Sequence, residues 1–126
     1  MYRIGSAAVI FIITVTIVTA GFLINTRTAS QVTDTINSAV VAANNNDTEK
    51  ALSVFRNALD IWKSNNSIML LFMSHGKIDQ IDESVNIACT YIENGDLDMF
   101  RAESKRSLVL LRHFNDLEYP SFTNIL

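Results

Sequence analysis

The distribution of charged and apolar residues divides the chain into two unequal parts. The first part runs from Ile4 to Thr26, contains no charged residue and is flanked by Arg3 and Arg27. In the second part, apolar residues recur every three or four positions, which is the spacing of an amphipathic helix. This pattern predicts an all-α protein, in which an N-terminal transmembrane helix is followed by an antiparallel helical bundle of about four helices.

The uncharged first part is long enough to cross a bilayer, whose hydrocarbon core needs roughly 20 apolar residues at a helical rise of about 1.5 Å per residue. We expect residues 4–26 to contact lipid, residues 1–27 to form a transmembrane anchor and residues 28–126 to form a soluble helical domain. The alternative is a cleavable signal peptide, because Val18-Thr19-Ala20 resembles a signal peptidase site. The apolar run continues past this pattern, which favours an uncleaved anchor.

Two turns rich in Asn and Asp divide the second part into helices. Asn44-Asn45-Asn46-Asp47 and Asn94-Gly95-Asp96 each combine a helix stop with an N-cap for the next helix, and either Asn46 or Asp47 can provide the first of these caps. The predicted helices span about residues 29–43, 48–74, 77–93 and 97–117. Because similar turns join two pairs of helices, the chain resembles a weak repeat of two helical hairpins.

The second of these helices carries the most regular apolar pattern. Leu52, Phe55, Leu59, Trp62, Met69 and Met73 follow an a/d rhythm, with Asn66 at one of its positions. We expect Phe55, Trp62 and Met69 to lie in the core of the bundle.

The charge balance narrows the classes of partner. Residues 28–126 carry 8 of the 10 Lys and Arg residues and all 13 Asp and Glu residues, which gives a net charge of −5. An acidic domain favours neither nucleic acid nor a polybasic contact with a membrane surface. The short N-terminus with Arg3 weakly favours a cytoplasmic N-terminus. We therefore expect a single-pass protein of the cell membrane with an extracytoplasmic C-terminal domain.

Cys89 is the only cysteine, so the chain cannot form an intramolecular disulfide. It lies among Ile87, Ala88 and Ile92. This context predicts a small buried hydrophobic residue rather than a bridge between two chains.

The stretch SHGKIDQIDESV contains the strongest candidate for a chemical site. His75 with Asp79 or Asp82, joined by His113, could supply metal ligands. However, the sequence has no HxxxH or HExxH motif and no Gly-rich phosphate loop. Each charge also has a structural explanation, in which Gly76 ends one helix after His75 and the carboxylates begin the next. We expect a helix junction without catalytic residues or a cofactor; a metal-binding or small-ligand sensor is the alternative function.

A run of six apolar residues, Ile68–Met73, ends the second helix and is too short to span a bilayer. If successive helices alternate in direction, this run lies beside the membrane together with the C-terminal tail. We expect a docking surface there, either for a membrane or envelope protein or for lipid headgroups, formed by Met69, Phe72, Met73, Phe122, Ile125 and Leu126. The alternative is that the tail folds back over the run. A homo-oligomer is a further option, although Gly5 and Gly21 do not form a GxxxG pair.

Several of these features together resemble a known family. The N-terminal hydrophobic segment, Trp62, the stretch HGKIDQIDESV, the turn YIENGD and the C-terminal FTNIL are similar to domain-of-unknown-function family 4363, small bacterial proteins of Firmicutes. The resemblance covers nearly the whole chain. It implies a membrane-anchored helical domain without an assigned activity, and it brings no catalytic residues.

Overall fold

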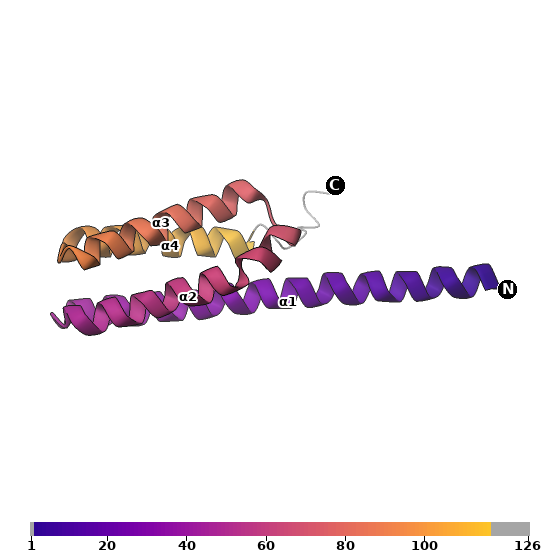
Figure 1. Ribbon diagram of the computed structural model, residues 1–126, viewed down its shortest axis with the longest axis horizontal. Coiled ribbons are helices and arrows are strands. Elements are labelled where there is room, and N and C mark those ends of the chain that lie inside the picture. The colour runs from indigo at the N-terminus through magenta and orange to yellow at the C-terminus, as the bar shows by residue number, and fades with distance from the viewer. Residues whose placement is uncertain (1, 117–126) are drawn as a thin grey trace.

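The computed structural model describes residues 2–116, which form four helices. These are α1 (Tyr2–Asn44), α2 (Thr48–Phe72), α3 (His75–Glu93) and α4 (Leu97–Asp116). Each helix packs against the next one along the chain, and α4 also packs against α1, so that the four form a closed ring (Figure 1). The described part of the chain therefore confirms the predicted all-α bundle.

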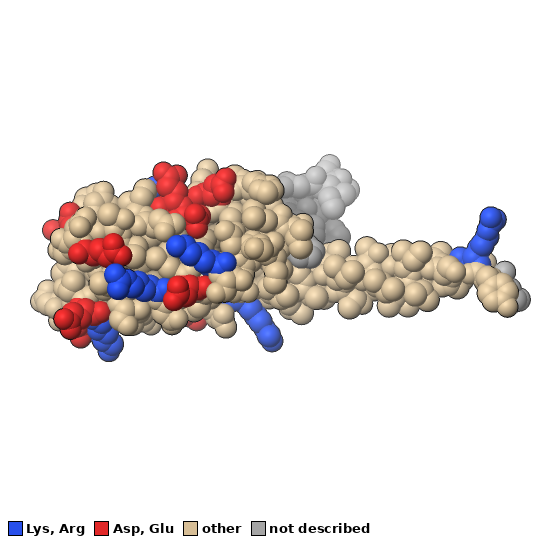
Figure 2. Space-filling view, viewed as in Figure 1, with Lys and Arg blue, Asp and Glu red and all other residues tan. Residues whose placement is uncertain are grey.

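α1 combines the predicted anchor and the first bundle helix in one unbroken helix. Every side chain from Tyr2 to Ala20 is exposed, and this part projects beyond the bundle (Figure 1). Gly21 is the first buried residue, and buried positions then recur as far as Ala43. Within residues 2–116, α1 is the helix that is long and apolar enough to cross a membrane. On the face shown in Figure 2, its projecting part carries charge only near the N-terminal end.

Polar groups within the projecting part are satisfied inside the helix. The hydroxyls of Thr14, Thr16 and Thr19 donate to the carbonyl oxygens four residues earlier, at distances of 2.8–2.9 Å. A threonine bonded in this way leaves no hydroxyl proton in search of a partner. These threonines are thus compatible with a hydrocarbon environment.

The turn between α1 and α2 is a Schellman motif followed directly by an N-cap. Asn46 adopts a left-handed conformation with φ of 58°, and the amide of Asp47 donates to the carbonyl of Ala42 over 3.0 Å. The carboxylate of Asp47 accepts from the amide of Lys50 over 3.1 Å. Of the two predicted caps, Asp47 is therefore the one that the fold uses.

The turn between α3 and α4 repeats this geometry. Gly95 has φ of 74°, the amide of Asp96 donates to the carbonyl of Tyr91 over 2.9 Å, and the carboxylate of Asp96 accepts from the amide of Met99 over 3.1 Å. Residues 49 positions apart are also buried in pairs, which confirms the weak repeat of two hairpins. The pairs are Ala29/Ile78, Val32/Ile81, Ile36/Val85, Ala39/Ala88, Ala43/Ile92, Ala51/Phe100, Phe55/Ser104, Ala58/Ser107 and Trp62/Leu111.

Large aromatic side chains of α2 and α4 meet in the centre of the ring. Phe55 contacts Phe100 edge to face with ring centroids 5.2 Å apart, and Trp62 contacts Phe114 in the same manner at 6.2 Å. Phe55, Trp62 and Met69 are fully buried, which confirms that they belong to the core.

The junction between α2 and α3 differs from the prediction. α2 ends at Phe72, Met73 is extended, and Ser74 is the N-cap of a helix that begins at His75. The predictions that His75 lies in the last turn of α2 and that Gly76 terminates it are therefore wrong. Met73 is only 8% exposed and packs in the core. The chain therefore leaves α2 at Met73, earlier than a cap at Gly76 would end the helix.

Candidate functional site

The α2–α3 junction lies at the pole of the bundle from which the projecting part of α1 extends (Figure 1). We call this the membrane-side pole. The two Asn/Asp turns lie at the opposite, distal pole, where Arg101 of α4 donates to the side-chain oxygen of Asn44 over 2.8 Å. The turns of both hairpins lie at this distal pole. The height of a residue above the distal pole can therefore be expressed as the number of residues between it and Asp47 (for α1 and α2) or Asp96 (for α3 and α4).

The apolar run at the end of α2 faces in two directions. Met69 and Met73 are 0% and 8% exposed, so the structure places these two members of the expected docking surface in the core. Ile68 and Leu71 point outward instead, with exposed fractions of 39% and 78%. Both belong to the run Ile68–Met73 that the sequence predicts as a contact surface, and the a/d rhythm assigns both to the outer side of the helix. The side chain of Phe72, and the residues Phe122, Ile125 and Leu126, lie outside the described part of the chain.

An exposed leucine of α1 lies at the height of Leu71. Leu23 and Leu71 are each 24 residues from Asp47, and both helices rise by about 1.5 Å per residue. Leu23 is 54% exposed. The two side chains therefore add to the apolar surface at the membrane-side pole, next to the projecting part of α1.

The structure does not gather the proposed metal ligands into one cluster. His75, Asp79 and His113 are exposed, and Asp82 is half-buried. His113 lines a shallow groove between α3 and α4 with Lys77, not with the carboxylates of α3. Within residues 2–116, no group of three or more His, Cys, Asp or Glu side chains is arranged to hold a metal ion.

A second groove runs between α1 and α4, has a volume of about 510 Å³, and combines apolar and polar lining. Leu108 and Val109 provide its apolar part, and Lys105 and Arg112 are its basic residues. Ser30, Thr33 and Asn37 of α1 form the opposite wall. Sequence reasoning misses this groove because its two walls are about 75 residues apart in the chain.

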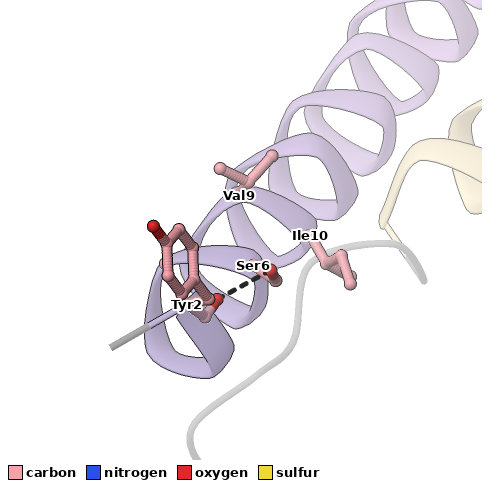
Figure 3. A pocket seen from close by; sticks show the side chains of 5 residues that line it. Tyr2, Ser6, Val9 and Ile10 are labelled. Carbon is pink, nitrogen blue, oxygen red and sulfur yellow. Dashed lines mark hydrogen bonds between the residues drawn. The ribbon is translucent and has the colours of Figure 1, made fainter.

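A hollow near the N-terminus offers no comparable chemistry (Figure 3). Tyr2, Gly5, Ser6, Val9 and Ile10 line it along the exposed surface of α1. The hydroxyl of Ser6 donates to the carbonyl of Tyr2 over 2.8 Å. Since this bond lies within the helix, the hydroxyl proton is not free to bind a ligand.

Buried polar groups without a partner occur on the membrane side of the core. Asn25 is only 2% exposed, and neither its side-chain nitrogen nor its oxygen has a hydrogen-bond partner within the described residues. The indole N–H of Trp62 and the side-chain oxygen of Asn66 are also buried without a partner. Each such group costs about 1–3 kcal/mol in desolvation, so these groups lower the stability of the membrane-side half of the bundle.

In the other half, several polar groups are bonded across helices, although the buried hydroxyl of Ser104 has no partner among the described residues. The buried hydroxyls of Ser84 and Ser107 are 2.8 Å apart, and Arg56 pairs with Glu93 over 3.3 Å. Cys89 is free and buried, as predicted, and its thiol donates to the carboxylate of Glu93 over 3.5 Å. Burial raises the pKa of the Cys89 thiol, and the adjacent Glu93 raises this pKa further. The thiol is therefore a poor nucleophile at neutral pH.

The comparison with known proteins gives one match. A family model described as Domain of unknown function (DUF4363) matches residues 23–125. The matched segment begins near the end of the uncharged run and includes the four helices of the bundle. No curated protein and no solved structure matches the chain.

Proposed function

The chain belongs to the DUF4363 family, and on this premise we propose that it is a non-enzymatic, single-pass membrane protein. Its bundle lies outside the cytoplasm and binds another membrane or envelope protein as an accessory module. The observation that carries this proposal is the exposed apolar surface formed by Leu23, Ile68 and Leu71 at the membrane-side pole. A partner that approaches within the membrane can cover this surface.

The continuity of α1 supports a role in which the bundle is held at a defined position relative to the membrane. No turn or proline separates its projecting part from the part that packs in the bundle. The bundle therefore keeps a fixed orientation relative to the proposed membrane span. An accessory subunit that presents a surface at a defined height above the bilayer requires such a connection.

The partner can be tested by photo-crosslinking in cells. A photoreactive amino acid at Leu71 should yield an adduct with one membrane protein, identified by mass spectrometry of the membrane fraction. The same amino acid at Thr90, which is exposed toward the distal end of α3, is the control and should not yield this adduct. Adducts with lipid alone at position 71, or the same proteins at both positions, would contradict a specific protein partner.

The orientation can be tested separately by labelling intact cells with a maleimide that does not cross membranes. Lys50 is exposed near the distal pole, so Lys50→Cys places a reactive thiol on the bundle, while Cys89 is buried. We expect Lys50→Cys to be labelled in intact cells. Labelling only after the cells are lysed would place the bundle in the cytoplasm.

A further inference from the structure

We propose that the membrane-side pole of the bundle is sunk into the bilayer, down to a belt of four basic side chains that bind the headgroups of anionic phospholipids. The inference rests on the membrane anchoring proposed above. It adds a second partner, the lipid surface, and a depth at which the bundle is held.

The belt contains one basic residue from each helix. Arg27 of α1 and Lys63 of α2 are 20 and 16 residues from Asp47, while Lys77 of α3 and Arg112 of α4 are 19 and 16 residues from Asp96. A difference of four residues along a helix corresponds to about 6 Å, which is comparable to the thickness of one headgroup layer. Residues between 14 and 85 positions apart in the sequence are thus brought to nearly the same height.

The region between the belt and the projecting part of α1 carries no charge on α1 or α2. There is no Lys, Arg, Asp or Glu between Arg3 and Arg27, nor between Lys63 and Lys77. The exposed Leu23 and Leu71 lie in this region. A pole whose α1 and α2 ends are free of charge and expose leucine is suited to the hydrocarbon boundary, where long basic side chains extend toward the phosphates.

The basic groups of the belt are available for an external anion. Among the side chains that the structure describes, ion pairs join Arg56 to Glu93, Arg101 to Asp98 and Arg106 to Glu103, and none of these pairs includes a residue of the belt. Asp79 and Asp116 lie at the height of the belt, and four further acidic residues lie two to three residues closer to the distal pole: Asp34, Asp60, Asp82 and Glu83. The positive excess is therefore confined to the layer of charge nearest to the membrane. Phosphate headgroups complement this excess.

The groove between α1 and α4 indicates where one headgroup can bind. Arg112 lines this groove at the height of Ser30, and Ser30 lies on the opposite wall together with Thr33. A guanidinium with nearby hydroxyl donors is suited to a phosphate group. Arg112 is therefore the residue of the belt whose replacement should reduce lipid selectivity most.

The depth can be measured with an environment-sensitive fluorophore in the full-length protein. In a Cys89→Ala background, Leu71→Cys is labelled and the protein is reconstituted in vesicles of phosphatidylcholine with about one third phosphatidylglycerol. At position 71 we expect blue-shifted emission that spin-labelled lipids quench. The same label at Lys50→Cys should show the emission that is typical of water. Emission typical of water at position 71 would overturn the proposed depth.

The charge of the belt can be tested by native mass spectrometry of the full-length protein in detergent with equal amounts of phosphatidylglycerol and phosphatidylcholine. The wild type should retain phosphatidylglycerol preferentially. Since each basic side chain near an anionic surface contributes about fivefold to binding, the double variant Arg27→Gln/Arg112→Gln should lose more than about tenfold of this preference. The matched control is Lys50→Gln/Arg106→Gln, which removes the same charge from exposed positions farther from the membrane and outside the groove.

The control variant should keep the lipid preference within about twofold. Equal losses in both variants, or no preference in the wild type, would overturn the belt. Binding of glycerol phosphate in place of the lipid would overturn it as well, because the site would then recognise a soluble anion. Absence of the protein from the membrane fraction would refute the membrane anchoring, whereas an anchored protein without lipid selectivity would refute only this inference.

Discussion

Single residues show how much local backbone geometry determines this fold. Gly95 adopts φ of 74° in the turn between α3 and α4, a conformation that costs most L-residues about 1 kcal/mol. Gly76 lies in the first turn of α3, and a Cβ placed there would meet only the hydroxyl oxygen of Ser74, at 3.8 Å. Glycine is therefore favoured at position 95, whereas position 76 can accept a larger residue.

We expect Gly95→Ala to lower the free energy of unfolding by about 1 kcal/mol. Gly76→Ala should raise it by about 0.5–1 kcal/mol, because alanine has the higher helix propensity. The measurement is thermal unfolding of the full-length protein in detergent, followed by circular dichroism. Shifts in the same direction for the two variants would contradict the assigned geometries.

Cys89 provides a second prediction at this scale. Because burial and Glu93 raise the pKa of its thiol, the folded protein should react with a maleimide far more slowly than the urea-unfolded protein at pH 7. The native rate should still be low at about pH 8.5, where a free thiol is half ionised. Lys50→Cys is the exposed reference, and equal native rates at the two positions would refute the burial of Cys89.

At the scale of the helices, the two ends of the bundle are stabilised differently. The distal pole has two capped turns and the hydrogen bond from Arg101 to Asn44, whereas the membrane side contains the unpartnered amide of Asn25. A helix end that opens first is expected where buried polar groups lack partners.

The cost of the buried amide can be isolated with two matched variants. Asn25→Ala and Asn37→Ala both gain helix propensity, but only Asn25 is buried. We expect Asn25→Ala to be more stabilising than Asn37→Ala by about 1 kcal/mol, because it removes an unsatisfied polar group. Equal changes in the midpoint of thermal unfolding would show that the amide of Asn25 is satisfied in the membrane-bound protein.

At the scale of the whole molecule, the boundary of the bundle coincides with the position where a signal peptidase could cut. The unbroken run of exposed residues ends at Ala20, and burial begins at Gly21. The exposed segment of residues 2–20 is about 28 Å long, close to the thickness of a hydrocarbon core. Cleavage at this point would leave all four bundle helices but remove most of the proposed anchor.

We expect the chain in the membrane fraction to retain residues 1–20. The intact mass of the protein isolated from membranes, determined by mass spectrometry, distinguishes the two forms. A mass that corresponds to a chain beginning at Gly21 would establish a signal peptide and contradict the single-pass anchor.

The sequence alone determined the features that depend on local order. The apolar period of α2 predicts its buried face, and the turns around Asp47 and Asp96 are recognisable because the left-handed residue and the cap are adjacent in the chain. The uncharged run predicts a helix of membrane-spanning length for the same reason. The family resemblance also follows from short stretches that can be recognised without a structure, and the family match confirms it.

Tertiary packing decided what distant parts of the chain do together. The local signals around Gly76 predict a helix end there, but Met73 packs in the core and α3 begins at His75. The same packing brings Leu23 of α1 to the height of Leu71 of α2, and the ring of helices brings basic residues of four separate segments to nearly one height. Such features depend on how the helices align, since no short stretch of sequence contains both sides of any of these contacts.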